Sequence, residues 1–280
     1  MLAFFFLTFA LTWGLWLAVV TPGGSGFVGL GGPVFLLGVF APALVALALT
    51  AKAEGRVAVT RLLARIGIWQ VPARWYVFAV SYLIAIKLTG ALIYRMTSGA
   101  WPAFGNTPLP LMLGAIVLST WVQAGEEVGW RGYALPRLAQ RLGLGLASIV
   151  LGVIWALWHL PLFFMPGSGS DGQSFPIYLL HVTALSVAMA WLYWKTGGSL
   201  LLVMVMHASV NNTTGIVPAA VPGAANAFSF SGSPVAWITI ALSWLVAVPL
   251  LVQMRSADIG AMVSQGVHER IGPGKPVPSI

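Results

Sequence analysis

The sequence has very little charge. Only 7% of its 280 residues are Asp, Glu, Lys or Arg, and just six of them are acidic, whereas soluble globular domains average about 25% charged residues. A chain with so few charges cannot cover a water-facing surface. Because 59% of the residues are hydrophobic and the mean hydropathy is +0.91, we predict an integral membrane protein with the lipid bilayer as its partner.

Cysteine is absent altogether, which excludes disulfides and catalysis by a thiolate. The sequence also lacks clusters of basic residues interleaved with aromatic residues. We therefore exclude a nucleic-acid partner. In a membrane protein, the net charge of +8 indicates which loops stay on the cytoplasmic side.

Runs of about 20 apolar residues have the length of membrane-spanning helices. The sequence contains eight such runs, which predict an all-α, polytopic eight-transmembrane-helix bundle over residues 2–20, 27–50, 75–96, 109–130, 145–165, 176–194, 198–220 and 234–254. No soluble insertion separates them, so we predict a single transmembrane domain, 1–255. Residues 256–280 are predicted to be a cytoplasmic C-terminal tail.

The basic residues are distributed asymmetrically between the predicted loops. Twelve of the fourteen follow spans two, four, six or eight, whereas Arg95 alone lies on the opposite side and Lys87 lies within span three. Loops rich in Lys and Arg stay in the cytoplasm. We therefore predict a multi-pass protein with both termini cytoplasmic.

Two adjacent acids, Glu126 and Glu127, lie near the cytoplasmic end of the fourth span. Ionisable groups inside a span are costly and usually mark a working site. Arg131 follows Glu127 by four residues, a spacing that allows a pair on one helical face. Neighbours on a helix point about 100° apart, so Glu126 is free to face a cavity and accept a proton there. The alternative is a purely structural clamp with Arg131.

Two further pairs of polar or aromatic residues recur at the same spacing of four. Trp155 and His159 lie in the fifth span, where His159 either points into the bundle or bonds a carbonyl freed near Pro161. His207 and Asn211 lie in the seventh span. Both side chains can donate hydrogen bonds to a developing oxyanion, although such groups also hold helices together in membranes.

Taken in order, Glu126-Glu127-x-x-x-Arg131, Trp155-x-x-x-His159 and His207-x-x-x-Asn211 resemble the CPBP (Abi) family of CAAX-processing and bacteriocin-processing intramembrane proteases. Within that family, the pattern is similar to that of the type II CAAX prenyl endopeptidases. The resemblance covers roughly residues 109–215. Trp155 stands where the family often has Phe.

The resemblance implies an intramembrane endopeptidase that cleaves a membrane-associated peptide or protein, lipidated or bacteriocin-like. It implies that Glu126 and His159 activate a water, that His207 and Asn211 stabilise the oxyanion, and that Glu127 and Arg131 brace the site. Trp155 would give structural support.

The sequence does not determine whether the protein uses a metal cofactor. A water activated by glutamate and histidine needs no metal, but Glu126, His159 and His207 are also legitimate ligands of a divalent metal such as zinc. A proton-coupled membrane transporter and a non-catalytic membrane scaffold remain alternative functions, because intramembrane Glu and His also build proton relays.

The predicted topology can be tested with single cysteines, since the native chain has none. Cysteines placed at Ser25 and at Ala58 are expected to react with a membrane-impermeant thiol reagent from opposite sides of the membrane, with Ala58→Cys labelled from the cytoplasm. Labelling of both positions from one side would contradict the eight-span topology.

Overall fold

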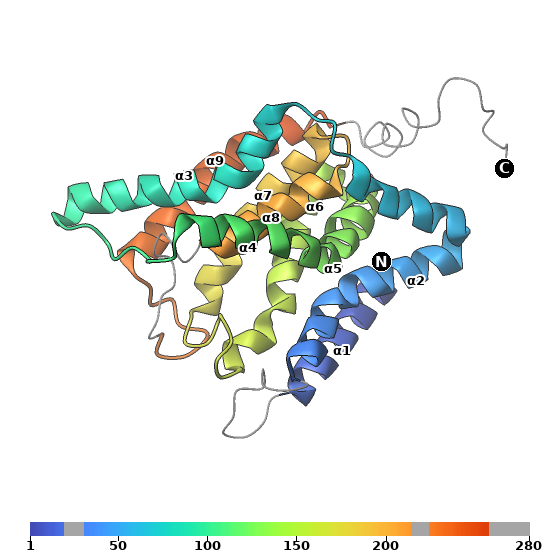
Figure 1. Ribbon diagram of the computed structural model, residues 1–280, viewed down its shortest axis with the longest axis horizontal. Helices are drawn as coiled ribbons and strands as arrows, with labels where there is room; N and C mark the ends of the chain where they lie inside the picture. Colours follow the sequence, from blue (N-terminus) through green and yellow to red (C-terminus); the bar gives the residue numbers. More distant parts are fainter. Residues whose placement is uncertain (20–30, 214–223, 258–280) are drawn as a thin grey trace.

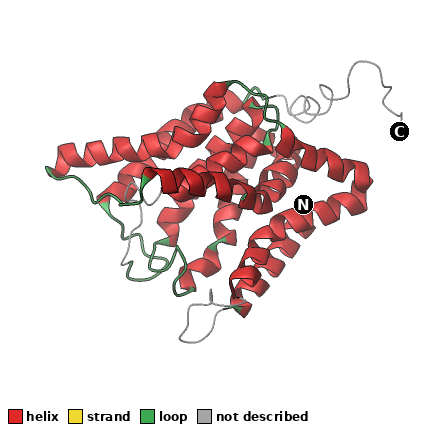
Figure 2. Ribbon diagram, in the orientation of Figure 1, coloured by secondary structure: helices red, strands yellow, loops and turns green. Residues whose placement is uncertain are grey.

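The computed structural model describes residues 1–19, 31–213 and 224–257. Every regular element in these residues is a helix (Figure 2). This confirms the predicted all-α class of an integral membrane protein. Five helical stretches are long and apolar enough to cross a membrane: Gly31–Gly67, Ala73–Ser98, Leu109–Phe164, Phe175–Lys195 and Pro234–Met254.

The helices do not divide as the eight predicted spans do. Predicted spans 109–130 and 145–165 both fall in the 56-residue stretch Leu109–Phe164, and the first and seventh predicted spans coincide with shorter apolar helices, Leu2–Ala18 and Leu200–Thr213. Residues 20, 27–30 and 214–220 of the predicted spans lie outside the described residues. The number of spans therefore stays a prediction, and so does the domain boundary at 255. Ser25 and the tail from residue 258 onward lie outside the described residues.

The helices are, in chain order, α1 (Leu2–Ala18), α2 (Gly31–Ala64), η1 (Arg65–Gly67), α3 (Ala73–Ser98), α4 (Leu109–Val122), α5 (Ala124–Glu127), η2 (Val128–Ala134), α6 (Leu135–Trp158), η3 (Leu160–Phe164), α7 (Phe175–Lys195), α8 (Leu200–Thr213) and α9 (Pro234–Met254). Two of them bend at a glycine with positive φ: α2 at Gly55 (81°) and α6 at Gly143 (72°). Glycine adopts this backbone conformation without steric cost.

Helices α7 and α8 lie at the centre of the bundle (Figure 1). Helix α7 packs against α6 on one side and α9 on the other, while α8 packs against α3 and α4. Helices α1 and α2 lie side by side, and α2 also packs against α5 and η2. The central position of α7 and α8 buries some of their polar residues away from lipid, among them Ser186, His207 and Ser209.

Glycines allow α2 to approach the α5–η2 segment closely. A Cβ atom at Gly129 would lie 2.6 Å from the carbonyl carbon and oxygen of Pro42, and one at Gly125 would lie 3.1 Å from Cα of Phe40. Small residues are common where membrane helices pack with their backbones in near contact. This contact positions the segment that carries Glu126 and Glu127.

We predict that Gly129→Ala destabilises the protein, because the added methyl group would meet backbone atoms that cannot move aside. The expected cost is about 1–3 kcal/mol, typical of overpacking, measured as a lower midpoint of thermal unfolding in detergent. Gly114→Ala is the matched control, since a Cβ there meets nothing within 4 Å. Equal melting temperatures for the two variants would contradict the proposed close packing.

Candidate active site

The two predicted acids lie at the junction of α5 and the π-helical segment η2, Val128–Ala134. Such wide turns inside α-helices occur frequently at functional sites. Nη1 of Arg131 donates to both carboxylate oxygens of Glu127, at 2.9 and 3.1 Å, and both side chains are completely buried. The structure thus contains the ion pair that the spacing of four residues predicts.

His207 brings α8 to this ion pair. Its Nδ1 lies 2.8 Å from Oε1 of Glu127. Because a carboxylate that is ion-paired to Arg131 accepts hydrogen bonds and does not donate them, Nδ1 of His207 must carry the proton. The Nε2 atom is then the imidazole nitrogen left for other partners.

Trp155 links the ion pair to the second acid. Its indole N–H donates to Oε2 of Glu126 at 2.7 Å, and the guanidinium carbon of Arg131 lies 4.2 Å from the ring centroid. Its ring also meets that of His207 edge-on, with centroids 5.1 Å apart. The difference from the family's usual Phe therefore has a physical consequence, since a phenyl ring has no N–H to donate to Glu126.

His159 follows Trp155 by one helical turn, at the end of α6. Its Nδ1 lies 2.8 Å from the carbonyl oxygen of Trp155. A carbonyl only accepts, so Nδ1 carries the proton here too, and Nε2 of the neutral ring is an acceptor. His159 thus borders the central cavity, and the carbonyl that it bonds is that of Trp155, six residues before Pro161.

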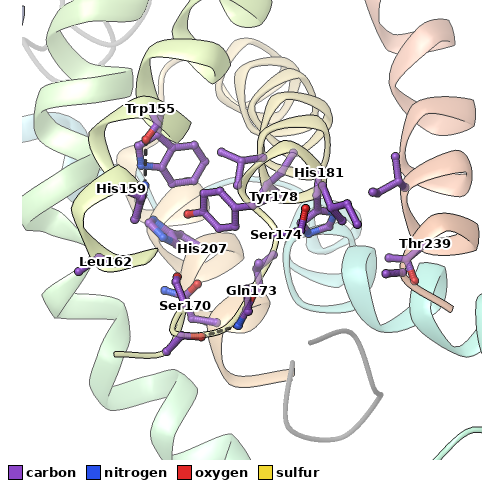
Figure 3. A pocket seen from close by; sticks show the side chains of 18 of the residues that line it. Trp155, His159, Leu162, Ser170, Gln173, Ser174, Tyr178, His181, His207 and Thr239 are labelled. Carbon is purple, nitrogen blue, oxygen red and sulfur yellow. Dashed lines mark hydrogen bonds between the residues drawn. The ribbon is translucent and has the colours of Figure 1, made fainter. Parts of the chain in front are cut away.

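A cavity of about 530 Å³ opens beside these side chains, between α6, α7, α8, α3 and α9. Four of the predicted residues line it: Glu126, His159, His207 and Asn211. Trp155 lines it as well (Figure 3), whereas Glu127 and Arg131 are not among the lining residues. The structure therefore gives the adjacent acids separate positions, one at the cavity and one in the buried ion pair.

The neighbouring Asn212 does not take part. Its amide donates to the hydroxyl of Ser119 and to the carbonyl of Ala208, each at 2.8 Å. That contact ties α8 to α4, the structural role that polar residues often have between membrane helices.

The placement of possible ligands does not favour a metal ion. In the part of the chain that the structure describes, no group of three or more His, Asp or Glu side chains is arranged to hold a metal ion. Glu126, His159 and His207 share a cavity, yet they do not form such a group.

Two contacts of the site were not anticipated from the sequence. Tyr178 on α7 meets the ring of His159 with centroids 5.5 Å apart and lines the cavity. Met189, also on α7, accepts a hydrogen bond from Nη2 of Arg131 at 3.3 Å. Ser174, Tyr178 and His181 recur at intervals of three or four residues, so a polar face of α7 was visible in the sequence. Met189 carried no comparable signal.

Comparison with known proteins supports the resemblance to the CAAX prenyl endopeptidases. Residues 108–213 match the family described as type II CAAX prenyl endopeptidase Rce1-like, and this segment contains every candidate site residue. The CAAX prenyl protease 2 of Methanococcus maripaludis is 28% identical over 225 residues, covering 74% of this chain and 81% of that protein. The resemblance predicted from the sequence is confirmed, and with it the enzyme class, a protease in a multi-pass membrane protein.

We predict that Arg131→Ala strongly destabilises the protein, because it leaves the Glu127 carboxylate buried without its cation. Breaking a buried pair by removing one partner costs about 3–5 kcal/mol. Thermal unfolding in detergent should show a large drop in the melting temperature, with loss of folded protein on expression. Arg141→Ala removes an exposed arginine and is the matched control. If both variants melt alike, the buried ion pair does not hold this region together.

Proposed function

We propose that this chain, which resembles the Rce1-like type II CAAX prenyl endopeptidases, hydrolyses a peptide bond of a membrane-associated substrate in the central cavity. The observation that carries the proposal is that the carboxylate of Glu126 and the imidazoles of His159 and His207 border one cavity inside an apolar bundle. A substrate ending in a prenylated C-a-a-X sequence fits this proposal best, because the lipid would bring its C-terminus to the membrane.

Glu126 is proposed as the general base. Its Oε2 is held by the indole N–H of Trp155 at 2.7 Å, so its other oxygen is available to a water in the cavity. Taking a proton from that water lets the oxygen attack the substrate carbonyl carbon. His159 offers an unprotonated Nε2, which can accept the second hydrogen bond of the same water and orient it.

His207 and Asn211 are proposed to stabilise the oxyanion of the tetrahedral intermediate. Since Nδ1 of His207 donates to Glu127, its Nε2 can donate to an oxyanion only when the ring holds both protons. Arg131, Glu127 and protonated His207 together then carry one net positive charge, which offsets the developing negative charge. Asn211 adds a neutral amide donor one turn further along α8.

The reaction then closes without a covalent enzyme intermediate. Collapse of the tetrahedral species breaks the carbon–nitrogen bond, and the proton taken up by Glu126 passes to the leaving nitrogen. The second proton of the water leaves the new carboxyl group and protonates the released amine, so the products are a carboxylate and an ammonium group, and Glu126 is again ionised. The predicted cytoplasmic face, rich in basic residues, would hold substrates at anionic lipid near the cavity.

We predict that Glu126→Gln lowers the turnover of a fluorescent farnesylated C-a-a-X peptide by ~10²–10⁴, the scale of losing a general base. The purified protein in lipid vesicles should remain folded, because glutamine keeps an acceptor for the Trp155 N–H. Asn211→Ala should cost about 10²–10³, the scale of one oxyanion donor. Cleavage is followed by mass spectrometry of both peptide products.

Glu54→Gln is the matched control, because it makes the same chemical change at an acid outside the cavity, in a surface pair with Arg137. It should cleave at the wild-type rate.

Prolonged treatment with a chelator separates the two schemes of water activation. Unchanged activity supports activation by glutamate and histidine alone, whereas a loss of activity that only added metal restores supports a metal-bound water. Full activity of Glu126→Gln would sink the proposed mechanism and favour the carrier or scaffold alternatives.

A further inference from the structure

The cavity has a second polar end, away from the proposed catalytic residues. Lys87 on α3, His181 on α7 and Thr239 on α9 line it together with Glu126 and His159. In Figure 3, His159 and His207 lie on one side of Tyr178, and His181 and Thr239 lie on the other. A single cavity therefore joins an acidic end at Glu126 to a basic end at Lys87.

The basic end is deeply buried. Only 1% of the surface of Lys87 is exposed, although a lysine within a membrane span normally extends toward the interface. In the described part of the chain, Nδ1 of His181 is buried and has no hydrogen-bond partner. A buried polar atom without a partner is costly and calls for an explanation. Both side chains reach the same cavity, so a ligand there can bind both.

The two ends are separated by a short distance along α7. The rings of His159 and Tyr178 have centroids 5.5 Å apart, and His181 follows Tyr178 by three residues, or about 4.5 Å of helix. The ring contact and the helical rise together place His181 on the order of 10 Å from His159, a distance that about three residues of extended peptide span. In a C-a-a-X sequence three residues follow the lipidated cysteine.

We propose that Lys87 and His181 bind the α-carboxylate at the C-terminus of the substrate. This inference rests on the proposed function and adds to it the two residues that would bind the free C-terminus of the substrate. The Lys87 ammonium supplies the charge, and His181 supplies a hydrogen bond through its imidazole. The pair would fix the direction of the peptide and place its scissile carbonyl beside Glu126.

The test uses two farnesylated C-a-a-X peptides that differ only in ending as a free carboxylate or as a carboxamide. For the wild-type protein in zwitterionic vesicles, kcat/KM is expected to be about 10- to 100-fold higher for the carboxylate, the ratio given by one charge-assisted hydrogen bond. Lys87→Met has nearly the same shape without the charge. Its kcat/KM values for the two peptides should differ by no more than about threefold, because only the cleavage of the carboxylate peptide becomes slower.

Lys52→Met makes the same change at an exposed lysine and should keep the wild-type preference. If Lys87→Met does not fold, His181→Phe measured with the same two peptides should reduce the ratio. Equal cleavage of both peptides by the wild-type protein would overturn the subsite while leaving the proposed function intact. A preference that persists in Lys87→Met, or that arises only with anionic vesicles, would place the anion site elsewhere. Failure to cleave either peptide would overturn the proposed function and this inference together.

Discussion

Three ionisable side chains buried in an apolar bundle constrain the whole site: Arg131, Glu127 and His207. Each charged group inside a membrane protein must be paired with an opposite charge, because neither lipid nor packed side chains solvate it. Glu127 meets this requirement by accepting hydrogen bonds from Arg131 on its own helical segment and from His207 on α8. The same contacts fix α8 against η2 and set the proton positions of the His207 ring.

The rotation between neighbouring residues on a helix explains the paired acids. With Glu127 committed to Arg131, Glu126 points about 100° away and reaches the cavity, where Trp155 holds one of its oxygens. Trp155 contacts both halves of the site, since its ring lies against the Arg131 guanidinium and its carbonyl receives Nδ1–H of His159. The proposed general base thus lies in the cavity, and the buried charges that are proposed to stabilise the oxyanion lie behind it.

The sequence was sufficient for features that depend on local spacing. Apolar runs predicted helices, and pairs four residues apart predicted the ion pair of Glu127 with Arg131. Features that depend on how helices rotate and bend in the bundle were not predictable from spacing. These include the π-helical segment at Val128–Ala134, the bend at Gly143, and the placement of Lys87 and His181 in one cavity with Glu126. Lys87 and His181 lie on separate helices, so only the packing of α3 against its neighbours brings them to a shared cavity.

In the proposed mechanism, a water molecule in the cavity attacks the substrate carbonyl directly. Cleavage of the farnesylated peptide in H₂¹⁸O containing hydroxylamine tests this most directly, with both products analysed by mass spectrometry. Direct attack by water predicts ¹⁸O in the new carboxylate and no peptide hydroxamate. A hydroxamate product would reveal an acyl-enzyme intermediate and contradict the proposed roles of Glu126 and His159.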